Sequence, residues 1–181
     1  GDNIFYGQGL IKQLKSANER TSRGTVFGYQ VLDPERYGVV DFDSKGKVIS
    51  IQEKPRNPSS NFAVTGLYFL DDTAPERVES ISPSARGELE ITDLLESYLL
   101  DDLLDVELMG RGFSWLDTGT QDSLIEASEF VRTIQKRQGL SIGCPEEISL
   151  SLGWITKEKF EKSIKNIPNN DYGNYLRSLL Q

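Results

Sequence analysis

The order of strand-type and helix-type segments constrains the fold of this chain more than any other feature. Short runs rich in β-branched and aromatic residues recur over residues 1–116, separated by helical segments and turn residues. From residue 120 onwards the pattern is helical, and it begins with a long amphipathic segment that Gly139 can end. We therefore predict a mixed α/β body over residues 1–139 and a helical C-terminal appendage over residues 140–181.

Hydrophobic periodicity and turn residues predict the individual elements. Strands are expected over residues 24–32, 37–42, 48–53, 63–70, 105–110 and 113–116, with 37–42 and 48–53 forming a hairpin. Helices are expected over residues 10–18, 74–81, 90–100, 120–139 and 172–180, and two further helical segments begin near residues 145 and 156. The inner stripe of the long helix is predicted to comprise Leu124, Ala127, Ser128, Val131, Ile134 and Gln138.

Composition narrows the possible chemistry. The chain has no His, which excludes Ser-His-Asp and Cys-His catalysis and His-ligated zinc within these residues. The net charge of −8 argues against nucleic acid as a partner. The single cysteine, Cys144, cannot form an intrachain disulfide, which is in keeping with a reducing compartment. No apolar run approaches the ~20 residues of a membrane span, so we expect a cytoplasmic protein.

Two aspartates far apart in sequence occupy similar, turn-like settings. Asp2 lies in Gly1-Asp2-Asn3-Ile4-Phe5-Tyr6-Gly7, which we interpret as the end of a buried strand turning into a loop, its preceding strand being upstream. Asp117 lies in Trp115-Leu116-Asp117-Thr118-Gly119-Thr120. Both could hold a hard cation in a site assembled by tertiary folding. Asp2 could equally be a turn or helix-cap residue, and Asp117 could cap the long helix.

Other residues have a functional and a structural interpretation. Lys54 leaves a strand just before Pro55 and is well aimed at a ligand phosphate, although Glu53 and Lys54 could form a solvated ion pair. Gly38 would let a ligand approach the backbone closely, or it could mark a bulge. Trp115 is more often a core residue than a ligand contact. Spacing alone supports a cleft compatible with a metal and a phosphate.

Eight segments follow one another in a distinctive order: Gly1–Gly7, Asp33-Pro34-Glu35-Arg36-Tyr37-Gly38-Val39-Val40, Glu53-Lys54-Pro55, Ala63–Tyr68, Ser84–Asp93, Trp115–Thr120, Gln138-Gly139 and Cys144–Ile148. Taken together, these segments resemble the sugar-nucleotidyltransferase family, and within it the glucose-1-phosphate thymidylyltransferases. The resemblance covers essentially the whole chain, and the ordered combination is highly specific.

The resemblance implies a Rossmann-like α/β nucleotidyltransferase fold with a mixed sheet. It implies a reaction in which dTTP and glucose 1-phosphate give dTDP-glucose and pyrophosphate, for dTDP-sugar biosynthesis such as that of rhamnose and lipopolysaccharide. Asp2 and Asp117 match the Mg²⁺ ligands, Lys54 a contact of the sugar phosphate and Glu53 an acceptor for a hexose hydroxyl. The sugar pocket is matched by Tyr37, Gly38, Val64 and Tyr68, with Trp115 beside the second metal ligand.

The family's Gly-rich triphosphate-binding segment has no counterpart here. The resemblance therefore predicts a chain truncated at its N-terminus and inactive alone. Part of a secondary nucleotide site near a subunit interface is also matched, and the parent would be a homo-oligomer, a tetramer in the family. The residues matching that secondary site are Tyr6, Gly7, Gly110, Arg111 and Glu147.

Two alternatives from other classes stay open. One is a catalytically silent module that binds a sugar phosphate or sugar nucleotide in the same pocket, and the other is a structural assembly fragment. Turnover of dTTP with glucose 1-phosphate separates the enzyme from both, whereas binding without turnover supports the silent module. An uncovered sheet edge would also favour self-association.

Overall fold

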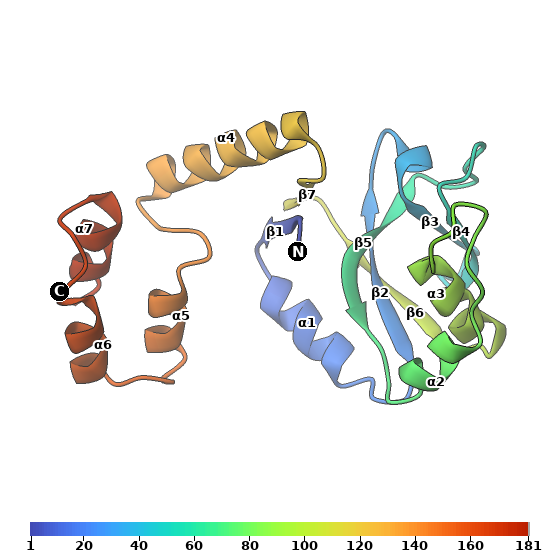
Figure 1. Cartoon of the computed structure of the whole chain (residues 1–181), viewed down its shortest axis with the longest axis horizontal. Helices are drawn as coiled ribbons and strands as arrows, with labels where there is room; N and C mark the ends of the chain where they lie inside the picture. The colour runs from blue at the N-terminus through green and yellow to red at the C-terminus, as the bar shows by residue number, and fades with distance from the viewer. Residues whose placement is uncertain (181) are drawn as a thin grey trace. The chain divides into compact units, whose positions relative to one another are not determined.

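The computed structural model describes residues 1–180 and divides the chain into two compact units, Gly1–Thr118 and Gly119–Gln181. The first unit contains the strands that the structure describes over residues 1–180, together with short helices (Figure 1). By internal contacts the long helix groups with the C-terminal helices. The expected domain boundary after Gly139 stays a prediction.

Apart from β1 and η1, which were not predicted, the elements of the first unit lie close to their predicted positions. The strands are β1 (Asn3–Gly7), β2 (Gly24–Gln30), β3 (Gly38–Phe42), β4 (Val48–Glu53), β5 (Phe62–Phe69), β6 (Leu104–Met109) and β7 (Phe113–Asp117). The helices are α1 (Leu10–Asn18), the 3₁₀-helix η1 (Pro34–Arg36), α2 (Ala74–Glu79) and α3 (Ile91–Leu100).

Five strands form a mixed sheet in the order β4-β3-β5-β2-β6. The predicted β3–β4 hairpin is confirmed, and its register sets Gly38 opposite Glu53. Strand β2 runs antiparallel to β5 and parallel to β6. Together with the structural neighbours described below, this mixed sheet confirms the predicted α/β class.

Helices cover both faces of the five-stranded sheet (Figure 1). On one face α3 buries Leu94, Leu95 and Tyr98 against strand residues such as Val26 and Val40. On the other face α1 packs Ala17 against Phe27 and Met109. Successive side chains of β2 point to opposite faces of the sheet, and both faces are covered. Residues on both sides of β2 are therefore buried, and its sequence does not alternate between apolar and polar residues.

Strands β1 and β7 form a separate, antiparallel two-stranded ribbon. Such a ribbon is marginal by itself, so it depends on packing for its stability. Phe5 and Phe113 supply that packing by joining the cluster around Phe27, and Tyr29 Oη donates to the carbonyl of Phe113 at 3.2 Å. The ribbon is thereby fixed to the face of the sheet that carries α1.

The second unit is helical, with α4 (Gln121–Gln138), α5 (Pro145–Ser151), α6 (Lys157–Ile164) and α7 (Asp171–Ser178). Gly139 ends α4 in the left-handed conformation, as predicted for its cap. The N-cap is Thr120, which accepts from the Ser123 N–H, so the alternative that Asp117 caps this helix is wrong. The predicted inner stripe of α4 is wrong at Leu124, Ser128 and Gln138, which are exposed, whereas Ala127 is buried and Val131 and Ile134 are half-buried. The core of this unit comprises Cys144, Phe160, Ile164 and Leu176. Over residues 1–180, no helix combines the length and apolarity needed to cross a membrane.

Candidate functional site

One pocket of about 230 Å³ in the first unit collects every residue predicted for the primary site. Its predicted lining residues are Asp2, Tyr37, Gly38, Glu53, Lys54, Val64, Tyr68, Trp115 and Asp117. They come from the five-stranded sheet, from the β1–β7 ribbon and from the segment before β3. Their convergence is therefore a property of the fold, while the role of each residue stays a prediction.

The two aspartates reach the pocket from the same end of the ribbon. Asn3 pairs with Asp117 across the β1–β7 ladder, and the backbone N–H of Thr118 donates to the Asp2 carbonyl at 2.7 Å. The expectation that the residues after Asp2 form a loop is wrong, because Asn3–Gly7 form β1. Antiparallel pairing nevertheless brings the start of β1 beside the end of β7, so both acids line one cavity.

Lys54 occupies a strained turn where β4 ends. Its φ of 40° lies in the left-handed region, which is uncommon for a non-glycine residue and disfavoured before a proline such as Pro55. Its backbone N–H donates to the carbonyl of Tyr37 at 3.0 Å, which holds the turn against the start of β3. Strain of this kind persists where the surrounding structure determines it, often at functional sites.

Glu53 is fixed by neighbours on three segments. Thr92 Oγ1 donates to its Oε2 at 3.3 Å, while Lys54 Nζ and Arg86 Nη1 lie 3.8 and 4.0 Å from its Oε1. A Cβ at Gly38 would lie 3.5 Å from the same Oε2 and 2.9 Å from Thr92 Cγ2. The missing side chain of Gly38 thus keeps this wall of the pocket open.

Aromatic side chains form the apolar part of the pocket. The rings of Tyr37 and Trp115 lie 5.0 Å apart, and Tyr29 packs on the indole at 6.0 Å. Burial, with the nearby Glu53 carboxylate, raises the pKa of Tyr68, and burial also raises the pKa of Tyr37. Both phenols stay protonated near neutral pH, so they can donate hydrogen bonds to the hydroxyl groups of a ligand.

The charge distribution of this pocket fits an anion together with a divalent cation. Asp2 and Asp117 lie on its ribbon side, and Lys54 and Glu53 lie on its sheet side. Within residues 1–180, no cluster of three or more His, Cys, Asp or Glu side chains could form a complete metal site. Two carboxylates suit Mg²⁺ all the same, since this ion is commonly held by one or two carboxylates plus phosphates and water.

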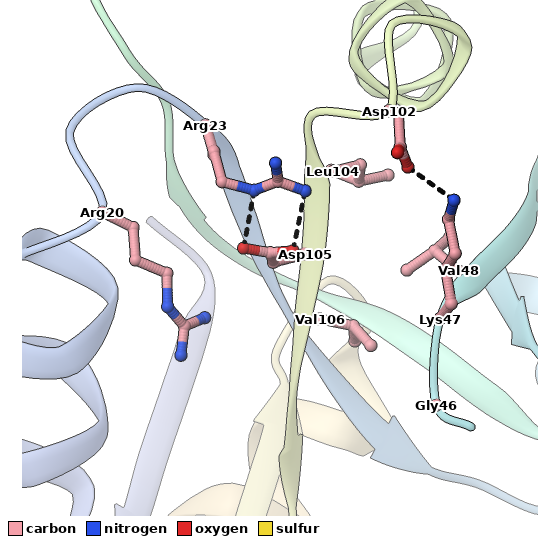
Figure 2. A pocket seen from close by; sticks show the side chains of 9 residues that line it. All are labelled: Arg20, Arg23, Gly46, Lys47, Val48, Asp102, Leu104, Asp105 and Val106. Atoms are coloured by element: carbon pink, nitrogen blue, oxygen red, sulfur yellow. Dashed lines mark hydrogen bonds and ion pairs between the residues drawn. The ribbon is translucent and has the colours of Figure 1, made fainter.

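A second polar pocket, of about 510 Å³, lies where β2 and β6 begin (Figure 2). Its cations are already matched by acids. Arg23 forms a bidentate pair with Asp105 at 2.9 and 3.1 Å, and Lys47 Nζ lies 2.8 Å from Asp102 (Figure 2). Arg20 pairs with Glu107. Since these charges neutralise one another, the first pocket is the better candidate site.

The residues predicted for a secondary nucleotide site fall into both units. Tyr6 and Gly7 end β1, and Gly110 and Arg111 lie in the β6–β7 turn, where the Phe113 N–H donates to the Gly110 carbonyl. Because Gly7 pairs with Phe113, these four residues lie near one end of the ribbon. Glu147 belongs to α5 of the second unit and accepts a hydrogen bond from Tyr175 at 2.6 Å. The secondary site stays a prediction.

Sequence reasoning missed several residues that line the first pocket. They are Asn3, Arg36, Gly66, Ile91 and Thr92. Asn3 adjoins Asp2, Arg36 precedes Tyr37, and Thr92 lies in the charged segment at the entrance of α3, so each belongs to a segment already singled out. Thr92 also carried a detectable signal, because it is a polar residue on the otherwise apolar inner face of α3, where it is buried.

Comparisons with known proteins agree with this geometry. The profile of the family described as nucleotidyl transferase matches residues 1–134. The chain therefore belongs to the nucleotidyl transferase family. A glucose-1-phosphate thymidylyltransferase of Xanthomonas campestris pv. campestris is 55% identical over 179 residues, covering 99% of this chain and 61% of that protein. The enzyme of the same name from Neisseria gonorrhoeae is 54% identical, with 99% and 62% covered.

Solved structures extend the comparison to three dimensions. A candidate glucose-1-phosphate thymidylyltransferase of Bacillus anthracis, solved with sucrose, superposes with a TM-score of 0.64 at 37% identity, over 72% of this chain and 52% of that one. A UDP-glucose pyrophosphorylase solved with UDP-glucose superposes with a TM-score of 0.63 at 24% identity, which supports the fold alone. The chain spans about 61% of the length of the first curated relative.

Proposed function

We propose that this chain carries the sugar-phosphate-binding part of a glucose-1-phosphate thymidylyltransferase. The observation that carries the proposal is the convergence of Asp2, Asp117, Glu53 and Lys54 on one pocket. The identity of 55% to a curated enzyme of that name, spread over 99% of this chain, supports the choice of reaction. The substrates are then dTTP and glucose 1-phosphate, and the products dTDP-glucose and pyrophosphate.

In the proposed reaction, a phosphate oxygen of glucose 1-phosphate attacks the α-phosphorus of dTTP. A new O–P bond forms while the bond between the α-phosphorus and the bridging oxygen breaks, and pyrophosphate leaves with that bond's electron pair. Phosphoryl-type transfers depend on positioning and charge neutralisation more than on a protein acid or base. A site without His is therefore suited to this chemistry.

Each pocket residue then has a defined task. Lys54 binds the phosphate of the sugar as a point charge, and its strained turn aims it into the pocket. Glu53, held by Thr92, accepts a hydrogen bond from a hexose hydroxyl. Tyr37, Val64, Tyr68 and Trp115 form the walls against which the sugar ring packs, and Gly38 leaves room for it.

Asp2 and Asp117 would hold Mg²⁺. When bound, this ion neutralises phosphate charge and orients the phosphates. Further proposals follow from the family resemblance: a homo-oligomeric protein in the cytoplasm, a role in dTDP-sugar biosynthesis for polysaccharide, and a secondary nucleotide site that includes Arg111 and Glu147.

The proposal is tested by pyrophosphate release from the natural full-length protein with dTTP, Mg²⁺ and glucose 1-phosphate. We expect release that requires the sugar phosphate and that Lys54→Met reduces by at least ~100-fold, as is usual when a charge-stabilising group is removed. Glucose 1-phosphate binding without pyrophosphate release would support the silent binding module instead. Absence of both binding and release would contradict the proposed function.

A further inference from the structure

Asn3 connects the aromatic wall of the pocket to the first of the two acids. The indole Nε1–H of Trp115 donates to Asn3 Oδ1 at 2.6 Å, and Asn3 Nδ2 donates to Asp2 Oδ1 at 3.0 Å. All three residues line the same pocket. A continuous hydrogen-bonded path therefore runs from Trp115 through Asn3 to Asp2.

The chemistry of the groups fixes the direction of this path. The indole N–H can only donate, so the Asn3 atom facing it has to be the carbonyl oxygen. The amide nitrogen then faces the other way, where an ionised carboxylate can only accept. Since neither end can be reversed, the amide of Asn3 has one favoured orientation, and its N–H always points at Asp2.

The position of Trp115 is itself firmly set. Its side chain is buried, and its ring lies 5.0 Å from that of Tyr37 and 6.0 Å from that of Tyr29. Its backbone pairs with Phe5 in the ribbon ladder. The donor that holds Asn3 is therefore one of the least movable groups of the pocket, whereas Asp2 is exposed and precedes the strand.

The side chain of Asn3 occupies its position only because Gly66 in β5 has no side chain. A Cβ at Gly66 would lie 2.5 Å from Asn3 Nδ2 and 2.9 Å from Asn3 Cγ, closer than real side-chain contacts. The backbone of Gly66 does not have a positive φ, so its conformation alone does not require glycine. The space taken by the Asn3 amide accounts for the missing side chain.

We propose that Asn3 is a positioning residue that sets the direction of the Asp2 carboxylate. Trp115 holds Asn3 by its indole hydrogen bond, and Gly66 leaves the space that the Asn3 amide occupies. The inference rests on the proposed function in that it takes Asp2 to be a metal ligand. Holding one carboxylate oxygen through Asn3 leaves the other to face a cation. Partners of this kind orient a ligand and typically contribute 10- to 100-fold to metal affinity.

Mn²⁺ is a suitable probe of this role, because it replaces Mg²⁺ at oxygen sites and broadens nearby NMR signals. The full chain, labelled with ¹⁵N, is titrated with Mn²⁺, and the half-broadening concentration is read from the Thr118 amide. We expect Asn3→Leu and Gly66→Ala each to raise that concentration about tenfold. Trp115→Phe, which keeps an aromatic ring but loses the N–H, should also raise the half-broadening concentration. Asn57→Leu, at an exposed asparagine outside the pocket, is the matched control and should match the wild type.

A second comparison separates positioning from a general loss of structure. In an Asn3→Ala background, Gly66→Ala should have no further effect on Mn²⁺, because the group it displaces is gone. If Asn3 had only a structural role, the variants would have lower melting temperatures, and Gly66→Ala would still change the Mn²⁺ response in the Asn3→Ala background. Retained Mn²⁺ affinity in both Asn3→Leu and Gly66→Ala, with affinity lost in Asp2→Asn, would overturn the positioning role alone. If Asp2→Asn leaves the half-broadening Mn²⁺ concentration unchanged, Asp2 is not a metal ligand, and the positioning role of Asn3 is overturned with it.

Discussion

The backbone N–H of Thr118 donates to the carbonyl oxygen of Asp2 at 2.7 Å, and Thr118 Oγ1 donates to the same oxygen at 2.9 Å. This double contact closes the end of the β1–β7 ribbon and joins the residue after Asp117 to Asp2 itself. Two acids far apart in the sequence are thereby held at one end of one small element. The relationship underlies the first prediction.

We predict that Asp2 and Asp117 share one divalent cation, with carboxylates roughly 4–7 Å apart given ligand distances of ~2.1 Å. Because they act as a unit, Asp2→Asn and Asp117→Asn should each lower kcat of the natural protein at least ~100-fold. The double variant should be little worse than either single one. An anomalous Mn²⁺ peak between the two carboxylates would verify the arrangement, and additive losses would speak against a shared ion.

Gly38→Ala should close the sheet side of the pocket. The new Cβ would lie 2.9 Å from Cγ2 of Thr92, which is buried and cannot move aside freely. We expect KM for glucose 1-phosphate to rise about tenfold, the equivalent of ~1.4 kcal/mol, with kcat less affected. Adding Thr92→Ser removes the clashing methyl group but keeps the hydroxyl that donates to Glu53. The double variant should therefore recover most of the wild-type KM for glucose 1-phosphate. Absence of any rescue would mean that Gly38 acts in another way.

The strain at Lys54 predicts a trade-off between stability and binding. Lys54→Gly should be more stable than Lys54→Ala by about 1 kcal/mol, because glycine adopts a φ of 40° without the steric cost that alanine retains. Both variants should lose affinity for glucose 1-phosphate, since both lose the cation. Urea denaturation and calorimetric titration measure the two effects separately. Equal stability of the two variants would show that the turn is relaxed.

Asp71 links the fold to acid stability. Hydrogen bonds from Thr73, and then from the buried Tyr98 hydroxyl at 2.8 Å, lower the pKa of Asp71 below its ordinary value of 3.8. A lowered native pKa stabilises the fold above about pH 4, and this contribution is lost as the pH falls through the native value. Asp71→Asn should therefore lower stability at pH 7 and flatten the dependence of stability on pH below 4. Urea midpoints at pH 7 and pH 3, with the exposed neighbour changed in Asp72→Asn as a control, test this prediction.

Local sequence patterns were sufficient to predict most of the elements. Turn residues such as Asp43 and Gly46 delimit the β3–β4 hairpin, and Thr120 and Gly139 mark the ends of α4 because both caps are local interactions. The pocket residues could be predicted individually because they belong to recognisable segments. In each case the information lies within a few neighbouring residues.

What could not be predicted depends on distant contacts. The pairing of β1 with β7 joins segments from opposite ends of the first unit, and no local pattern specifies it. That Asn3–Gly7 form a strand, and not the expected loop, follows from that pairing. Asn3 was missed for the same reason, since its role appears only when Trp115 is placed beside it. The exposure of Leu124 likewise depends on which surfaces pack on α4.

The division of the first unit into a five-stranded sheet and a two-stranded ribbon has a consequence for any ligand of the pocket. Lys54 and Glu53 lie on the sheet side, whereas Asp117 ends β7 of the ribbon and Asp2 directly precedes β1. A molecule that engages both sides works as a cross-link between two bodies that are otherwise joined by packing, a few hydrogen bonds and the chain connections between their strands. Its binding should therefore slow amide hydrogen exchange most in β1 and β7, the strands with least support of their own. A ligand confined to one side would leave that exchange unchanged, so the ribbon itself reports how far across the pocket a molecule reaches.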